Sequence, residues 1–407
     1  MFELEVVWQW LVEKLGHAAA PFVLGLLAGA GVVVSRFIWR QVRRAWCFFS
    51  SRARALRAVA RDYTKDGPHE GRGLWLSKPI TQPTNYENSI GKPVVLVVAN
   101  HKGGVGKTTI CGNLGAFWAR EWQKNVLLID LDSQGTLSAM ALRAGNWLPP
   151  KGQDSAATRA VSGDLEPSIF VGLAKEVPQE PKLKCVPAYY DLAQADNRLI
   201  VEWLLKCKPR KKAYNLFFGD TFKRHDVRYN LADLLQSPAV RQEFHVVIID
   251  CPPRFTTGSV QALCAGSHLL IPTILDLPSS EAVVAFVEEV ERLRTGGVCP
   301  HINHVGIVGT MTSPNVDGIA ERSAKALISD ALRDRKITAT ALLDDSLFVQ
   351  QATAFVNNSE EGIAYLVTTN NQRQQAARQA IARLSEYVAG QIGLPPPPAQ
   401  QSASKRT

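Results

Sequence analysis

The sequence predicts an α/β fold with a doubly wound, mostly parallel sheet over residues 93–390, preceded by a single transmembrane helix. Within 93–390, apolar runs rich in β-branched residues alternate with segments of helical periodicity, which is typical of a parallel sheet with helices on both faces. A glycine-rich turn follows the first apolar run, and aspartates end two others. Doubly wound sheets bind ligands at the C-terminal ends of their strands, so these stretches indicate one site.

The expected strands are short apolar runs bounded by polar or turn-forming residues. They are 93–99, 126–130, 183–187, 246–250, 268–273, 304–309 and 338–343. The chain of 407 residues is 46% hydrophobic, which is enough for a proper core in one large domain or two smaller ones.

The stretch KGGVGKTT at 102–109 has the pattern of a phosphate-binding loop and indicates a P-loop NTPase domain. An apolar strand precedes it, and a helical segment begins at Lys107. In such a loop backbone N–H groups surround the β-phosphate of ATP, Lys107 reaches the β- and γ-phosphates, and the Thr108 hydroxyl binds Mg²⁺. The residues expected to bind the nucleotide are Gly103, Gly104, Val105, Gly106, Lys107, Thr108 and Thr109. A chance glycine-rich turn would not explain why a strand precedes the loop and a helix follows it, as the phosphate-loop pattern requires.

Aspartates stand at the ends of two further strands. Asp130 and Asp132 lie in VLLIDLDSQG, and Asp250 lies in HVVIIDCPPRF. One aspartate beside a phosphate loop can hold Mg²⁺ through water, and another can orient the attacking water. A single aspartate after a strand often only caps the next helix, but three in register with a phosphate loop favour a catalytic site.

The segments KGGVGKTT, DLDSQG and DCPPRF, in this order, resemble the deviant Walker A, switch I and switch II motifs of the ParA/MinD family of ATPases. We call residues 130–135 switch I and residues 250–255 switch II. The similarity extends through about residues 93–390 and includes CVPAYYDLAQADNRL and LLIPTILDLPSSEAV, which flank the switches.

The resemblance implies an ATPase that forms a sandwich homodimer with ATP. In that family the extra lysine, here Lys102, reaches the phosphates of the partner's ATP, where a second cation offsets charge that grows in the transition state. By the same match Lys107 is catalytic and binds phosphate, and Thr108 binds Mg²⁺. Asp132 would orient the attacking water, and Asp250 would be the outer-sphere Mg²⁺ group. The role of Asp130 stays open between catalytic and structural.

The chain departs from the family pattern at a few positions. Ser133 stands where proline is usual, and Arg254 follows the double proline where a small residue is commoner. Leu343 and Asp344 occupy positions where the family often has Pro-Arg, so no residues are assigned to the adenine.

Residues 16–35 carry no formal charge and would span roughly 30 Å as a helix, the thickness of a bilayer core. We predict a transmembrane helix over 16–36 and a short extracytoplasmic segment over 1–15. The alternatives are a buried core helix and a cleaved signal peptide, but the front of the chain is acidic where a signal peptide is basic. Gly25 and Gly29 form a GxxxG pair, and their role in helix pairing stays open.

Eight arginines and no acidic residue occur between Leu15 and Arg61, whereas the whole chain has a net charge of +9. The positive-inside rule then predicts a single-pass protein of the inner membrane with its ATPase domain in the cytoplasm. Residues 37–61 are predicted to form a basic amphipathic juxtamembrane helix. It would either lie on the anionic leaflet, with residues 36–61 in contact with the lipid, or form a solvated neck. Residues 62–92 read as a linker, and 391–407 as a disordered tail.

Two basic regions raise the question of nucleic acid. The insertion 204–230 interleaves lysines and arginines with aromatic residues, so it fits nucleic acid, an acidic partner or a solvated loop. A late helix carries further arginines where family members contact DNA, although a solvent-facing surface explains them equally well; they are Arg373, Arg378 and Arg383.

The function expected is therefore a membrane-anchored ATPase switch that closes a dimer with ATP and recruits or positions an unidentified partner, which can be DNA, a protein complex or envelope machinery. The alternatives are a bacterial tyrosine kinase-like protein, a sensor-effector ATPase of a defence-type system and a non-hydrolysing scaffold. An iron–sulfur reductase needs cysteines that bridge a dimer, and neither Cys111 nor Cys251 matches that role. The seven cysteines are scattered, which indicates a reducing compartment without a disulfide framework.

Overall fold

The computed structural model describes residues 6, 9–10, 12–14, 16, 32–46, 73–76, 93–145, 152–163, 165–206, 226–312, 318–351, 355, 362–367 and 372–397. The chain divides into two compact units. One comprises Met1–Arg61 with Cys207–Thr221, and the other comprises Asp62–Lys206 with Phe222–Thr407.

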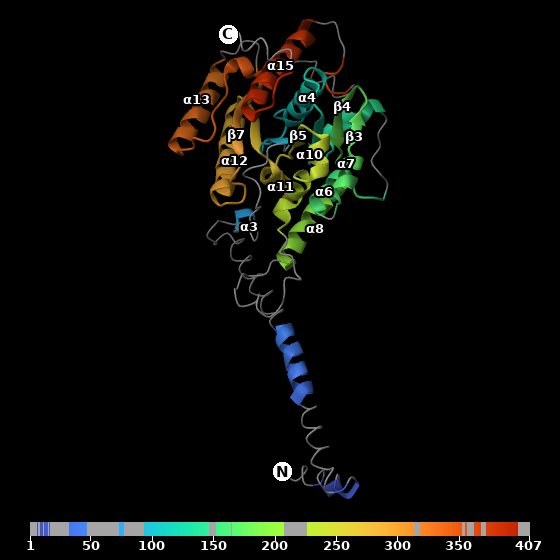
Figure 1. The fold of residues 1–407 in the computed structure, drawn as a ribbon. Coiled ribbons are helices and arrows are strands. Elements are labelled where there is room, and N and C mark those ends of the chain that lie inside the picture. Colours follow the sequence, from blue (N-terminus) through green and yellow to red (C-terminus); the bar gives the residue numbers. More distant parts are fainter. Residues whose placement is uncertain are drawn as a thin grey trace. The chain divides into compact units, whose positions relative to one another are not determined.

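Within the described residues of the larger unit, eight strands form one sheet in the order β3-β4-β2-β5-β1-β6-β7-β8 (Figure 1). Neighbouring strands are parallel throughout, except that β3 runs antiparallel to β4. The strands are β1 (Val94–Val98), β2 (Val126–Asp130), β3 (Lys175–Val177), β4 (Glu180–Val186), β5 (Val246–Asp250), β6 (His268–Ile274), β7 (Asn303–Thr312) and β8 (Val349–Gln350).

Helices surround the sheet (Figure 1). They are α3 (Gly73–Leu76), α4 (Lys107–Arg120), α5 (Thr136–Leu142), α6 (Ala156–Ser162), α7 (Pro167–Leu173), α8 (Asp191–Lys206), α9 (Asn230–Leu235), α10 (Pro238–Glu243), α11 (Thr257–Ala265), α12 (Leu277–Thr295), α13 (Ile319–Asp334) and α15 (Gln372–Ile392). Short 3₁₀ turns are η1 (Arg143–Gly145), η3 (Val227–Tyr229) and η4 (Asp345–Leu347).

The central strands are buried on both faces, as their unbroken apolar runs predict. A Cβ on Gly115 of α4 would lie 2.8 Å from Leu128 and 3.5 Å from Ile248, so α4 covers that face. Gly266, directly after α11, lies against Val97. Val97 is the register partner of Ile249, which points to the opposite face of the sheet from its neighbour Ile248. The end of α11 therefore lies on the other face. The doubly wound, mostly parallel sheet predicted from the sequence is therefore confirmed.

Six of the seven expected strands are present with small shifts of their ends. The segment 338–343 is not a strand: it forms a single parallel bridge, Leu342 with Ile307, and the chain then turns into η4, which Asp344 caps. The edge position is taken by β8 instead. The short β3 was not expected, because three residues with two exposed charged side chains carry no apolar pattern.

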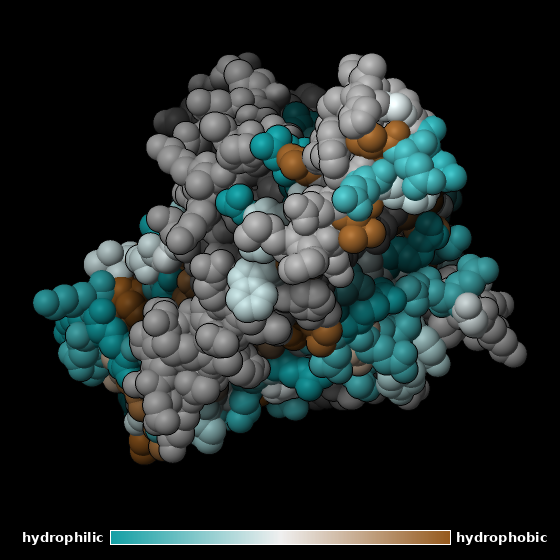
Figure 2. Space-filling view, turned by 90° about the horizontal axis from the view of Figure 1, so that it is seen from below, coloured by the Kyte–Doolittle hydropathy of each residue, from teal (hydrophilic) through white to brown (hydrophobic). Residues whose placement is uncertain are grey.

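The predicted single-pass location in the inner membrane is corrected by the structure. In the parts of the chain that are described, no helix is both long and apolar enough to cross a membrane. On the face shown in Figure 2, coloured hydrophobic residues are scattered between hydrophilic ones. Most of the expected span, including Gly25 and Gly29, lies outside the described residues.

Four other expected segments can be compared in part. Residues 47–61 lie outside the described chain, as do most of 62–92, but 73–76 form α3 and two of their side chains pack against the core. Most of the insertion 204–230 also lies outside it. At the other end, α15 continues past residue 390 to Ile392, and Leu394 is buried at 5% exposure.

Candidate functional site

The loop between β1 and α4 is held in shape by the two neighbouring strands. Gly104 and Gly106 adopt left-handed backbone angles, φ 73° and 79°, which favour glycine. The amide of Asn100 donates to the Pro272 carbonyl at 2.8 Å, and its oxygen accepts the Lys102 N–H at 3.2 Å. The Thr310 hydroxyl lies 2.9 Å from the Val105 carbonyl. The loop is therefore organised by β6 and β7 before any ligand binds.

Lys107 lies at the start of α4 and is only 6% exposed. Its Nζ donates to the Lys102 carbonyl at 2.9 Å, so the side chain folds back over the loop. Burial lowers the pKa of Lys107, and the charge of Asp250 opposes this shift. A phosphate group in the loop would supply the counter-charge that this ammonium group needs.

Thr108 and Asp250 meet although 142 residues separate them. The Thr108 hydroxyl donates to one carboxylate oxygen of Asp250 at 2.7 Å. The other oxygen is buried and has no hydrogen-bond partner among the described residues. Burial and the charge of Asp130 raise the pKa of Asp250 to about 8. A hydroxyl beside an unpaired buried carboxylate oxygen offers the hard oxygen ligands that Mg²⁺ prefers, so these residues fit the expected cation.

The two aspartates of switch I have different surroundings. Asp130 accepts hydrogen bonds from Ser138 N at 2.9 Å, Ser138 Oγ at 2.7 Å and Asp132 N at 3.0 Å. Burial raises the pKa of Asp130 to about 6 despite these bonds. Asp132 is partly exposed and accepts only the Gln134 N–H, at 3.0 Å, in the described chain. The geometry thus favours a structural role for Asp130 and leaves Asp132 accessible for a water molecule.

Lys102 is partly exposed at the tip of the loop. Its backbone is engaged on both sides, because its N–H bonds to Asn100 and its carbonyl accepts from Lys107. No hydrogen bond of its side chain is found within the described ranges.

His101 was not singled out from the sequence, because a histidine beside a glycine-rich loop has no pattern of its own. Its ring makes edge contacts with Phe255 of switch II at 4.5 Å and with Phe286 of α12 at 5.0 Å between ring centroids. Burial and the charge of Lys107 lower the pKa of His101 to about 4, so the ring is neutral at physiological pH. This neutral ring joins the phosphate loop to switch II.

A family model described as "AAA domain" (AAA_31) matches residues 94–302, just over half of the chain, a range that includes the phosphate loop and both switches. The chain belongs to the AAA_31 family.

The AAA_31 domain also resembles individual proteins. It is 29% identical over 231 residues to the chromosome partitioning protein ParA of Caulobacter vibrioides. This alignment covers 57% of this chain and 74% of the relative. A McdA–ATP complex from Cyanothece has a TM-score of 0.55 at 16% identity, over 73% of this chain and 96% of that one. The ParA of pNOB8 has a TM-score of 0.53 at 18% identity, over 74% and 99%. At such identities the two structures establish the fold alone, and the expected ParA/MinD-like P-loop ATPase fold is confirmed.

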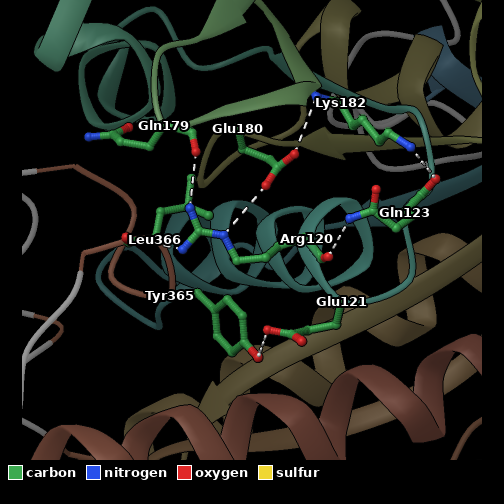
Figure 3. Close-up of polar contacts among 8 residues, drawn as sticks. All are labelled: Arg120, Glu121, Gln123, Gln179, Glu180, Lys182, Tyr365 and Leu366. Carbon is green, nitrogen blue, oxygen red and sulfur yellow. Dashed lines mark hydrogen bonds and ion pairs between the residues drawn. The ribbon is translucent and has the colours of Figure 1, made fainter.

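The segment 362–367, which follows the range that the family model matches, is fixed to the C-terminal end of α4 (Figure 3). Arg120 donates to the Leu366 carbonyl at 3.3 Å and pairs with Glu180 at 3.4 Å. The Tyr365 hydroxyl donates to Glu121 at 3.1 Å. These contacts connect the chain around Tyr365 to the helix that begins at the phosphate loop.

The arginines expected on the last helix have intramolecular partners. The Arg378 guanidinium lies 4.7 Å from the centroid of the Tyr365 ring, and Arg383 donates to the Ser346 carbonyl at 3.2 Å. The side chain of Arg373 lies outside the described residues. Arg378 is partly buried in this contact, whereas Arg383 stays exposed.

Two alternatives find no support in the described AAA_31 domain. Cys111 and Cys251 are buried, and burial raises the pKa of both thiols, so neither is placed to bridge an iron–sulfur cluster between protomers. Tyr365 is 6% exposed and bonded to Glu121, which does not fit an accessible phosphorylation site.

A pH dependence of Mg²⁺ binding follows from Asp250. Its carboxyl holds a proton below about pH 8, and a cation must compete with that proton. We expect the apparent affinity for Mg²⁺ in the presence of ATP to fall as the pH drops below about 8, by up to about tenfold per pH unit. Titrating Mg²⁺ with a fluorescent ATP analogue at several pH values measures this. The variant Asp250→Asn controls for titration of the phosphate, and an identical pH dependence in that variant would contradict the assignment.

Proposed function

We propose that the protein is a ParA-like ATPase of a partitioning or positioning system, in which ATP closes a homodimer that recruits a partner and hydrolysis releases it. The observation that carries this proposal is the convergence of Lys107, Thr108 and Asp250 on one phosphate loop, which also carries a second, partly exposed lysine, Lys102.

Each residue contributes a distinct step. The loop N–H groups, the N-terminus of α4 and Lys107 bind the β- and γ-phosphates. Thr108 and Asp250 hold Mg²⁺, which neutralises phosphate charge when bound. Asp132 orients a water molecule in line with the γ-phosphate. Lys102 of one protomer contacts the phosphates of the other, so hydrolysis requires the dimer.

Similar proteins support ATP as the ligand and partitioning as the process. The McdA structure contains ATP, and the Caulobacter relative is a chromosome partitioning protein. The cargo of this chain, whether DNA or a protein complex, is left open by these likenesses.

The test is the solution mass of the full-length protein with Mg²⁺ and either ATP or ADP. Asp132→Ala slows hydrolysis, so the ATP-bound state lasts through the measurement. We expect a dimer with ATP and a monomer with ADP. A monomer with both nucleotides, in samples shown to bind ATP, would contradict the dimer switch and leave only the ATPase.

A further inference from the structure

The helix α8 contacts the segment that follows switch II. The Asp196 carboxylate accepts the backbone N–H of Thr257 at 2.5 Å, and the Asp196 carbonyl lies 3.4 Å from the Thr257 hydroxyl. Thr257 is the first residue of α11 and comes two residues after the end of switch II. Asp196 therefore fixes the point at which switch II enters α11.

Two turns further along, α8 reaches a cluster that we call the Trp75 dock, made of Trp203, Asp226 and Arg228, which are buried, and Trp75, which is partly buried. Arg228 is fully buried and pairs with Asp226 at 2.6 Å. Its guanidinium lies 4.8 Å from the Trp203 ring centroid and donates to the Trp75 carbonyl at 2.7 Å. The Trp75 ring stacks on the Trp203 ring at 6.0 Å. The dock thus holds residues 73–76 against the end of α8 and against η3.

The contacts at Asp196 and Trp203 lie on one side of α8. The two residues are seven positions apart, which is about two turns and about 10 Å of helix. Leu199, between them on the same side, is buried. A continuous hydrogen-bonded helix moves as a unit over this distance, so a shift of Asp196 displaces Trp203 as well.

Space for such a shift exists beside the switches. A pocket of about 330 Å³ lies between α8 and the chain after Asp130 and Asp250. Its lining includes Leu192 and Asp196 of α8 and Arg254 and Phe255 of switch II. The pocket leaves room for switch II to change position without displacing core side chains.

We propose that Asp196 is a positioning residue that couples switch II to the Trp75 dock through α8, so that the nucleotide determines how firmly residues 73–76 are held. This inference rests on the proposed function, because it requires switch II to respond to ATP. The coupling is reciprocal: a change in docking alters the relative affinity for ATP and ADP by the same factor.

Hydrogen exchange of the full-length protein tests the coupling, with peptides that cover 73–76. Spectra are compared with ATP and with ADP in the Asp132→Ala background, and nucleotide binding is measured in the same samples. We expect exchange at 73–76 to differ about fivefold or more between the two nucleotides. Asp196→Ala should remove this difference, whereas Asp196→Asn should keep it, because the amide oxygen still accepts from Thr257. Arg198→Ala, on the same helix but paired with Asp154, is the matched control and should behave like the parent.

A second variant covers the case in which Asp196→Ala fails to fold. Trp75→Ala should shift the ratio of ATP to ADP affinity by the factor seen in exchange. Unchanged exchange at 73–76 in samples that bind ATP would overturn the coupling alone, as would a full response in folded Asp196→Ala. Absence of ATP binding by the parent protein would overturn the proposed function, and the coupling with it.

Discussion

Replacing Lys102 by alanine is expected to abolish the ATP-dependent dimer and to lower kcat for ATP hydrolysis about 1,000-fold or more, the range seen when a transition-state cation is lost. The Lys102 backbone shapes the loop through Asn100 and Lys107, and alanine keeps both of these bonds. The loop should therefore still bind ATP, so the loss concerns the second protomer. Steady-state phosphate release, solution mass and equilibrium ATP binding measure the three quantities.

Lys175→Ala is the matched control for that result, because it removes the same charge from an exposed position in β3. It should hydrolyse ATP and dimerise like the parent. A dimer of normal stability in Lys102→Ala would show that the second lysine is not what links the protomers.

Replacing Arg228 by methionine is expected to lower the free energy of unfolding by about 3–5 kcal/mol, because it removes the guanidinium that pairs with the buried Asp226 carboxylate. Both side chains are fully buried, so water cannot compensate. Burial alone would lower the pKa of Arg228, but its bonds to Asp226 raise it, which shows how strongly the pair is coupled. Urea unfolding followed by circular dichroism measures the change.

The double variant Asp226→Asn with Arg228→Met separates charge from packing. Asparagine keeps the oxygen that accepts the backbone N–H of residue 228 and removes the buried negative charge that Arg228 balances in the parent protein. About 1–2 kcal/mol should be regained. If the double variant is no more stable than Arg228→Met alone, the buried charge is not the cause of the loss.

The centre of the site was predictable because local patterns and one topological rule determine it. The phosphate loop is a contiguous motif, and the aspartates end buried strands. In a parallel sheet such ends share one edge, so Asp130 and Asp250 become register partners and Thr108 reaches Asp250.

Other features depend on contacts that no local pattern reports. The Trp75 dock joins residues 153 positions apart, and in the sequence Arg228 is only one of the cations of the basic insertion 204–230. The segment 338–343 has the apolar pattern of a strand, yet it pairs with β7 only at Leu342, because Asp344 begins η4. The role of His101 depends on its contacts with the rings of Phe255 and Phe286, which come from distant parts of the chain.

The contact between Trp203 and Arg228 has a consequence for how the crossover from β4 to β5 tolerates change. These residues stand on either side of 207–225, which lies outside the described residues, and their side chains are in contact, so the described chain returns to one place there. The entropy of closing a loop between fixed ends grows only slowly, by about 0.6 kcal/mol for each doubling of its length. A change in the number of residues between Trp203 and Arg228 should therefore cost little stability and leave the register of β5 beside β1 and β2 unchanged.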